Sequence, residues 1–328
     1  MIARWCVYAV LSFFAVATFQ ASVAYAEVMS FPSKPITLVV PTSAGGAVDT
    51  IARLVAIHVG KDLAQPVTVE NRPGAGGNIG TSSVARASAD GHTLIFISST
   101  QLVAQLTTSP PPFDLFKDFA SVGLVADACE VIAINSKVRA NNLQEFAAAA
   151  RAESSMFNYA TPGIATVPHL GAEMLARALN IKMVHVPFRG SMEGMREMAA
   201  GNIQMSIATQ PSVAPFIDGN NLIKIIAVAG PKRLSSLPDV PTTGESGYPE
   251  VEIAFWAGIM APKNTDREVL AKLSQSLNKT LSDPEVRSTL PKQGIDPVSG
   301  GPVALTDRLT HYAKLYSHIL KEIDLSQK

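Results

Sequence analysis

Short apolar runs alternate with segments of helical periodicity along most of the chain from residue 36 onward. Ile36–Val40 is an unbroken apolar run of strand length, and residues 48–63 then repeat apolar side chains at helical spacing. This alternation is typical of βα units and predicts an α/β fold with a mainly parallel sheet. Further strands are predicted at residues 67–70, 93–97, 121–135 (several strands, with Cys129 between them), 158–159, 182–186, 203–207, 222–229 and 253–261, and further helices at residues 79–87, 143–151, 169–179, 191–200, from 211, 266–281, 284–293 and 302–323.

The predicted elements form two sets of βα units, which favours a two-domain chain. The length of 328 residues agrees, because a domain typically takes about 150 residues. The C-terminal helices are expected to rejoin the N-terminal set, so the first lobe is discontinuous. We expect the first lobe over residues 27–125 and 226–328 and the second over 126–225, with crossovers near residues 123–131 and 223–256.

The first 26 residues have the pattern of a secretory signal peptide. Arg4 supplies the positive charge, residues 7–18 form an apolar run, and Ala24 and Ala26 provide a small-x-small cleavage site. The alternative, an uncleaved anchor, is disfavoured because a membrane span needs about 20 apolar residues. Cys6 precedes the apolar run, so it is not placed as a lipoprotein cysteine. We therefore predict cleavage after Ala26 and export of the remaining chain to the periplasm.

Composition and charge narrow the function classes. Apolar residues make up 47% of the chain and charged residues 16%, which excludes a disordered chain or a coiled coil. Lys and Arg together number 27, as do Asp and Glu, and this balance argues against nucleic acid as a partner. After cleavage Cys129 is the only cysteine, so no intramolecular disulfide forms.

Two strand-to-helix loops are candidate anion sites. Residues 43–46 (SAGG) follow the first strand, where free backbone N–H groups and the positive helix end favour an anion. The alternative is an ordinary βα turn in which Asp49 caps the first helical turn. Residues 161–169 form a second such loop with hydroxyls and a glycine, and it would face the first loop if the lobes close. His169, at the start of its helix, is either a ligand contact or a structural hydrogen-bonding group.

The other motifs point away from an enzyme. Residues 72–80 (RPGAGGNIG) invite comparison with the dinucleotide fingerprint G-x-G-x-x-G, but Gly76 and Gly80 are one residue too far apart. The next strand also ends without an acidic residue for a ribose, so a structural glycine turn is favoured. No nucleophile elbow or H-E-x-x-H occurs, and the six histidines form no ligand cluster at metal spacing. We therefore expect no catalytic residues, no metal and no cofactor.

Long ungapped blocks of the chain match a known pattern. They include FPSKPITLVVPTSAGGAVDTIAR, QPVTVENRPGAGGNIG, FKDFASVGLVA, MVHVPFRG and AVAGPKRLSSLPDVPTTGESGYP. In this order, over essentially all of the chain after the signal segment, the sequence resembles the substrate-binding proteins of tripartite tricarboxylate transporters, called the Bug family. The resemblance implies a two-lobed, periplasmic-binding-protein-like fold of type II ("Venus flytrap") with a ligand cleft between the lobes.

The resemblance also implies a function without catalysis. A small organic carboxylate is held between the lobes and delivered to the membrane subunits of a tripartite tricarboxylate-type transporter. We expect a monomer that binds no nucleic acid. One alternative is a ligand-sensing protein that signals to a membrane sensor kinase without transport. The other alternative is a nucleotide-dependent enzyme that uses the glycine turn of residues 74–80, and the export signal argues against it.

Carrying the family's ligand loops onto this sequence gives the candidate site. In the family the carboxylate is gripped by the strand-to-helix loops of both lobes, partly through backbone groups. Here Gln204 and Ala208 stand where two aspartates are usual, and the loss of an aspartate at Ala208 weakens the case for an amino-acid ligand. Arg189 replaces the usual lysine, and its guanidinium either forks onto a carboxylate or stays at the surface. The candidate ligand-binding residues are Thr42, Ser43, Ala44, Gly45, Gly46, Asp49, Ser98, Ser99, Thr161, Gly163, Thr166, His169, Arg189, Gln204 and Ala208.

Overall fold

The structure, a computed structural model, describes residues 31–152, 157–217 and 221–325. Contacts between Cα atoms divide the chain into Met1–Ser33 and a second compact unit, Lys34–Lys328, and the account below concerns the second unit. The predicted signal peptide, residues 1–26, lies outside the described residues. Across the described ranges, no helix has both the length and the apolar character needed to span a membrane.

A ten-stranded sheet runs through the Lys34–Lys328 unit. Its order is β2-β1-β3-β9-β4-β7-β5-β6, and β8 and β10 pair with β4 beside this path. β1 pairs in parallel with β2 and β3, and β5 pairs in parallel with β6 and β7, as the βα alternation predicts. The strands are β1 (Ile36–Val40), β2 (Val67–Asn71), β3 (Thr93–Ser98), β4 (Phe119–Asn135), β5 (Asn158–Thr161), β6 (Val184–Pro187), β7 (Met205–Thr209), β8 (Ile223–Ala229), β9 (Ala254–Pro262) and β10 (Ile295–Pro297).

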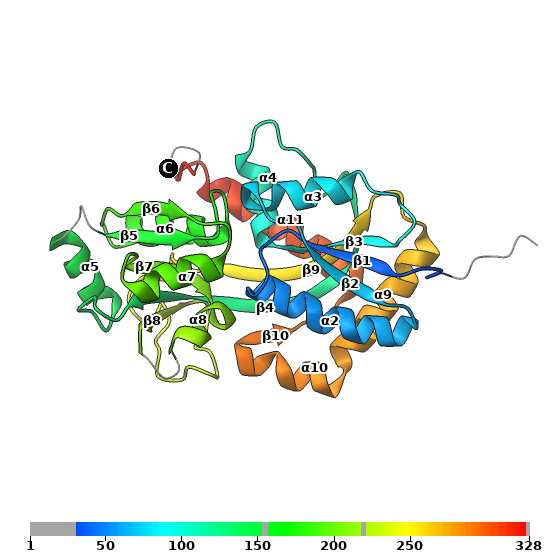
Figure 1. Ribbon diagram of the computed structural model, residues 1–328. Helices are drawn as coiled ribbons and strands as arrows, with labels where there is room; N and C mark the ends of the chain where they lie inside the picture. Colours follow the sequence, from blue (N-terminus) through cyan, green and yellow to red (C-terminus); the bar gives the residue numbers. More distant parts are fainter. Residues whose placement is uncertain (1–30, 153–156, 218–220, 326–328) are drawn as a thin grey trace, which may run out of the picture. The chain divides into compact units, whose positions relative to one another are not determined.

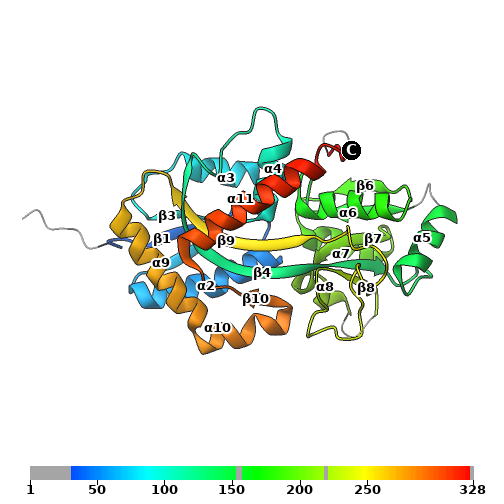
Figure 2. The same ribbon diagram turned by 180° about the vertical axis from the view of Figure 1, so that it is seen from behind.

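One strand, β4, belongs to both halves of the sheet. Residues 119–129 pair with β9, and residues 130–135 pair with β7 and β8 instead. We call the half that holds β1, β2, β3, β9 and β10 the first lobe and the half that holds β5, β6, β7 and β8 the second lobe. Figures 1 and 2 show β4 and β9 passing from one lobe toward the other. The two-lobed, periplasmic-binding-protein-like fold implied by the resemblance is therefore confirmed, whereas the lobe limits at residues 125 and 225 remain predictions.

The continuity of β4 corrects one detail of the sequence analysis. Several strands were expected over residues 121–135, with Cys129 as a break, but β4 is a single strand of 17 residues. Cys129 lies instead at the point where the pairing partner changes from β9 to β7 and β8. Hydrogen bonds from both lobes hold this stretch extended, and nothing in its local sequence records that exchange of partners.

The helices cover the faces of the two half-sheets. α2 buries Ile51, Val55 and Val59 against the first half-sheet, at the spacing predicted for its apolar face. α11 packs along β4, which Figure 2 shows from behind. The α-helices are α2 (Ala47–Leu63), α3 (Asn78–Ala85), α4 (Ser99–Thr107), α5 (Leu143–Ala152), α6 (Val167–Ala178), α7 (Ser191–Ala200), α8 (Gln210–Ile217), α9 (Arg267–Ser282), α10 (Pro284–Thr289) and α11 (Gly301–Ile319), with short 3₁₀ turns at Ala75–Gly77 and Pro291–Gln293.

Two elements were missed by the sequence analysis. α4 begins at Ser99, directly after β3, where a plain loop was expected. Ser98 caps it through a capping box with Gln101, whose side chain accepts a hydrogen bond from the Ser98 backbone N–H at 2.8 Å. β10 has three residues, too few to show a period, and exists because Asp296 pairs with Asp127 of β4.

Candidate functional site

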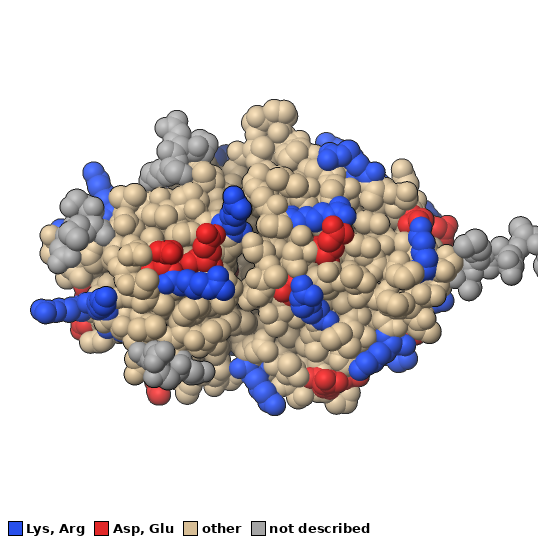
Figure 3. All heavy atoms as spheres, viewed as in Figure 1, with Lys and Arg blue, Asp and Glu red and all other residues tan. Residues whose placement is uncertain are grey.

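A cavity of about 480 Å³ lies where the loops of the two lobes meet. Its walls are mainly the loops at the carboxyl ends of the parallel strands, where α/β sheets generally bind their ligands. Figure 3 shows a narrow hollow between the two halves of the face seen there. The lining residues are Pro41, Thr42, Ser43, Gly46, Ala47, Val48, Pro73, Gly74, Ala75, Gly76, Gly77, Asn78, Ser98, Thr100, Thr108, Glu130, Pro162, Gly163, Ile164, Ala165, Thr166, Pro168, Pro187, Phe188, Arg189, Gly190, Ser191, Ala208, Thr209, Ser212 and Phe255.

The N-termini of five helices converge on this cavity. The N-cap residues of α2, α3, α4, α6 and α7 all line it, and they are Gly46, Gly77, Ser98, Thr166 and Gly190. For all of these helices except α4, no side chain caps the first backbone N–H groups. Uncapped N–H groups and the positive ends of helix dipoles favour a bound anion. The cavity is therefore built to accept negative charge without a cluster of cations.

Charged side chains are few in the cavity wall. Of the described residues that line it, Arg189 and Glu130 alone carry ionisable side chains. Arg189 is exposed, and Glu130 is buried. The rest of the wall combines small hydroxyl residues with prolines, glycines and apolar side chains such as Phe188 and Phe255. Such a wall suits a small ligand with an apolar body and one or two polar ends.

Asp49 holds the shape of the first loop and does not line the cavity. Its carboxylate accepts hydrogen bonds from the Gly45 backbone N–H at 2.9 Å, from Arg53 Nε at 3.0 Å and from Asn71 Nδ2 at 2.9 Å. Burial alone would raise the pKa of Asp49, but the hydrogen bonds from Arg53, Gly45 and Asn71 outweigh it and lower that pKa. Asn71 also donates to the Thr42 carbonyl at 3.1 Å. An ionised Asp49 thus ties the loop to β2.

The hydroxyl groups of the second lobe's loop are also used in the loop itself. Thr161 Oγ1 donates to the Gly163 carbonyl at 3.0 Å, and Thr166 Oγ1 donates to the same carbonyl at 2.8 Å. His169 is fully buried, and its Nδ1 accepts the Ala165 N–H at 3.3 Å. Its ring stacks on His185 with centroids 4.0 Å apart. His169 therefore supports the loop from behind.

The structure brings about half of the candidate residues together around the cavity. Those that line it are Thr42, Ser43, Gly46, Ser98, Gly163, Thr166, Arg189 and Ala208. Those outside the lining are Ala44, Gly45, Asp49, Ser99, Thr161, His169 and Gln204. Gln204 precedes β7, at the end of that strand away from Thr209, and its Oε1 accepts the Asn158 N–H at 2.8 Å. Gln204 therefore joins two strands of the second lobe, at a distance from the lining residues Ala208 and Thr209.

The glycine turn after β2 was taken for a purely structural turn, yet it lines the cavity. Pro73 to Asn78 form a wall, and a Cβ at Gly76 would lie 2.9 Å from the Ile164 carbonyl oxygen of the second lobe. Gly76 has φ +63°, which glycine adopts without strain. The sequence signal was available, because this turn follows a parallel strand just as residues 43–46 follow β1.

The two lobes touch a second time beside the first loop. Ser43 Oγ donates to the Arg189 carbonyl at 2.8 Å. A Cβ added at Gly190 would lie 2.7 Å from Ser43 Cβ, closer than real Cβ contacts. The absence of a side chain at Gly190 therefore permits the lobes to approach as they do.

Glu130 and Phe255 were missed because both lie inside long apolar runs. Glu130 is 2% exposed, and its Oε2 is buried without a hydrogen-bond partner among the described residues. Burial raises the pKa of Glu130 from its ordinary value of 4.5 to about 8. An acidic residue at the centre of an apolar strand was the signal, and the change of strand pairing placed it at the cavity.

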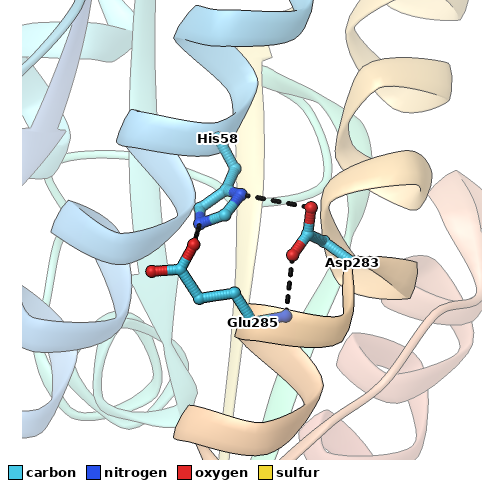
Figure 4. Close-up of side chains that lie close together, drawn as sticks. All are labelled: His58, Asp283 and Glu285. Carbon is cyan, nitrogen blue, oxygen red and sulfur yellow. Dashed lines mark hydrogen bonds and ion pairs between the residues drawn. The ribbon is translucent and has the colours of Figure 1, made fainter.

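A separate cluster joins α2 to α10, away from the cavity (Figure 4). His58 Nδ1 lies 3.6 Å from Asp283 Oδ2, and His58 Nε2 lies 3.5 Å from Glu285 Oε2. Asp283 Oδ1 also accepts the Glu285 N–H at 2.8 Å as the N-cap of α10. The two carboxylates face different ring nitrogens, whereas a metal ion takes one nitrogen of a histidine. We interpret the cluster as a contact between helices.

Comparison with known proteins supplies a family. A family model described as "Tripartite tricarboxylate transporter family receptor" matches residues 51–325. A protein described as "UPF0065 protein in tcbD-tcbE intergenic region" of Pseudomonas sp. (strain P51) is 35% identical over 299 residues, covering 90% of this chain and 88% of that protein.

Solved structures agree with the fold. The periplasmic binding protein BugD is 30% identical with a TM-score of 0.86, covering 90% of this chain and 99% of that one. MatC from Rhodopseudomonas palustris, solved with malate, is 28% identical with a TM-score of 0.84, covering 88% and 100%. Rpa4515 of R. palustris, solved with adipate, is 26% identical with a TM-score of 0.85, covering 89% and 97%.

The burial of Glu130 predicts a pH-dependent difference in stability from Glu130→Gln. The folded state retains a proton that the unfolded state releases near pH 4.5, so raising the pH favours unfolding until the folded pKa of about 8 is passed. From about pH 5 to pH 8, the wild type should lose about 1.4 kcal/mol per pH unit relative to Glu130→Gln. Urea unfolding at several pH values measures this difference, and parallel curves would contradict it.

The contact between Gly190 and Ser43 predicts that Gly190→Ala opens the lobes. Gly190 has φ −175°, an extended conformation that alanine adopts, so neither lobe should lose stability. Forcing a methyl group against Ser43 costs about 1–3 kcal/mol, which disfavours the present arrangement at least about tenfold. Small-angle X-ray scattering should show a larger radius of gyration than the wild type. The double variant with Ser43→Gly, which removes the clash, should restore the wild-type value.

Proposed function

Because the chain belongs to the tripartite tricarboxylate transporter receptor family, we propose that it captures a small organic carboxylate in the periplasm between its two lobes. It then delivers this ligand to the membrane subunits of a tripartite tricarboxylate-type transporter. The proposed role is binding without catalysis, and it uses no cofactor. Export by removal of residues 1–26 and a monomeric state are parts of the same proposal.

The convergence of five helix N-termini on one cavity carries this proposal. Two oxygens of a carboxylate can accept hydrogen bonds from several free backbone N–H groups at once. These groups come from both lobes, with α2, α3 and α4 on one side and α6 and α7 on the other. A ligand anion placed between them links the lobes, and its binding therefore favours the arrangement in which they touch.

Ligand chemistry in related structures points to the same class. MatC was solved with malate and Rpa4515 with adipate, both of which are dicarboxylates. The cavity of about 480 Å³ is within the range typical of small-molecule sites. Its apolar wall residues suit the methylene groups of such acids, while the helix N-termini suit a carboxylate. We propose that Arg189 reaches the ligand from the rim of the cavity, where its exposed guanidinium keeps its charge in water.

A thermal-shift panel of carboxylic acids tests the proposed function directly. A ligand at 100 times its dissociation constant adds about 2.7 kcal/mol to the free energy of unfolding, which should raise the melting temperature by several degrees. Succinate, malate, glutarate and adipate are compared with their diamides, which should give no shift. The protein is first unfolded and refolded to remove any ligand acquired during expression. If no acid of the panel raises the melting temperature, the carboxylate proposal is wrong.

The first loop offers a second test. A Cβ at Gly46 meets no atom within 4 Å, because it projects into the cavity. Gly46→Trp should therefore fill the space beside the α2 N-terminus and weaken binding of the best acid more than about 100-fold, with little change in ligand-free stability. Gly46→Ala is the matched control and should bind within a few-fold of the wild type. Isothermal titration calorimetry measures both, and wild-type affinity in Gly46→Trp would show that this loop is not the site.

A further inference from the structure

Glu130 stands where a bound ligand would meet the strand shared by the two lobes. It is the first residue of β4 to pair within the second lobe, opposite Thr209 of β7 and Ala229 of β8. It lines the cavity, and its Oε2 is fully buried with no hydrogen-bond partner among the described residues. A buried polar atom without a partner costs about 1–3 kcal/mol, so its presence in a binding cavity suggests that the partner is the ligand.

We propose, resting on the carboxylate-binding function above, that the Glu130 carboxylic acid donates a hydrogen bond to the far end of the bound ligand and so determines specificity. The cavity then selects a ligand whose first carboxylate lies on the helix N-termini and whose other end carries a hydrogen-bond-accepting oxygen.

The groups around Glu130 favour its protonated form. Thr209 and Ser212 offer hydroxyl groups that lie 3.4 Å from each other, Ala229 offers none, and Phe255 of β9 is apolar. On α11, Tyr316 donates its hydroxyl hydrogen to the Ala254 carbonyl at 3.2 Å. Burial raises the pKa of Tyr316, and the Glu130 charge raises it further. None of these groups is a cation.

The remaining charged neighbours lie on other sides of the strand. Cys129 projects to the opposite face of β4, where Asp296, Lys232 and Glu252 act on its thiol. Burial is the first cause that raises the pKa of Cys129, to about 11. In the loop before α7, the backbone N–H of the exposed Arg189 donates to Glu193 Oε2 at 3.2 Å. With no cation to stabilise its anion, Glu130 remains mostly a neutral acid at pH 7.

The proton on Glu130 decides which ligands are accepted. A neutral acid donates to a carboxylate or hydroxyl oxygen, whereas an ionised Glu130 would repel a second carboxylate across a poorly hydrated space. An ionised Glu130 would instead prefer a ligand ammonium group. Malate and aspartate differ mainly in a hydroxyl group against an ammonium group, so they separate these two possibilities. Under the proposal, malate binds more tightly than aspartate.

Calorimetric titrations of the refolded full-length exported chain between pH 6 and pH 9 test the inference. The probe is the tightest-binding acid among malate, succinate, glutarate and adipate, whose carboxyl groups are ionised across this range. The dissociation constant should be nearly flat up to pH 7 and should rise about tenfold per pH unit above pH 8. Titrations in buffers of different ionisation enthalpy should show uptake of about half a proton per ligand near pH 8.

Three variants identify the group responsible. Glu130→Gln keeps a donor, so its dissociation constant should stay within about fivefold of the wild type at pH 7 and should not rise above pH 8. Glu130→Ala should bind at least about tenfold more weakly at every pH. Tyr316→Phe is the matched control and should keep the wild-type pH profile, because Tyr316 does not line the cavity.

The outcomes separate this inference from the function on which it rests. Binding of an acid with a flat pH profile, or with the same profile in Glu130→Gln, overturns the role of Glu130 and leaves carboxylate capture intact. Tighter binding above pH 8, or preference for aspartate over malate that Glu130→Gln abolishes, shows an ionised Glu130 and also overturns the inference. Failure of every acid in the panel overturns both proposals together.

Discussion

The hydrogen bonding of β4 to both half-sheets is the constraint on which the rest of the structure depends. Its first part pairs with β9 and its last six residues pair with β7 and β8, so the two lobes share one continuous backbone ladder. A strand bonded along its whole length resists bending in the plane of the sheet, while twist about its axis remains possible. Relative motion of the lobes therefore has to be absorbed at β4 and at the neighbouring end of β9.

The location of the cavity follows from that shared strand. Each lobe has parallel strands flanked by helices, and the loops at the carboxyl ends of those strands face the junction. Every strand-to-helix loop there ends at a helix N-terminus, so a concentration of uncapped N–H groups is a consequence of the topology. The balanced composition of the chain agrees with this, because an anion site made from backbone dipoles needs no surplus of lysine and arginine.

Glycines determine how closely the lobes approach. Gly76 faces the Ile164 carbonyl, and Gly190 faces Ser43, each at a distance that leaves no space for a methyl group. These two positions lie on opposite walls of the cavity, one from each lobe. Their conformational needs differ, since Gly76 has a positive φ and Gly190 an extended backbone. The close approach of the lobes, more than turn geometry, therefore accounts for glycine at residue 190.

Much of the fold was predictable because it depends on local periodicity. The strand at Ile36–Val40, the helix after it and most later elements lie within two residues of the expected bounds, since apolar spacing alone distinguishes a strand from a helix. The resemblance to the Bug family was confirmed by the family match and by BugD. The candidate loops were also correct in outline, because strand-to-helix loops of parallel sheets share one edge.

Which side chains face the cavity was decided by the tertiary structure. Asp49, Thr161 and His169 belong to the correct loops, but their polar atoms bond within those loops. Glu130 looked like an ordinary strand residue, and only the exchange of pairing partners along β4 brings it to the cavity without a partner. The sequence by itself determined the elements, the family and the chemistry of the loops, because these depend on neighbours along the chain. Tertiary structure alone decided the cavity wall and the environment of Glu130, because both depend on contacts between residues far apart in the sequence.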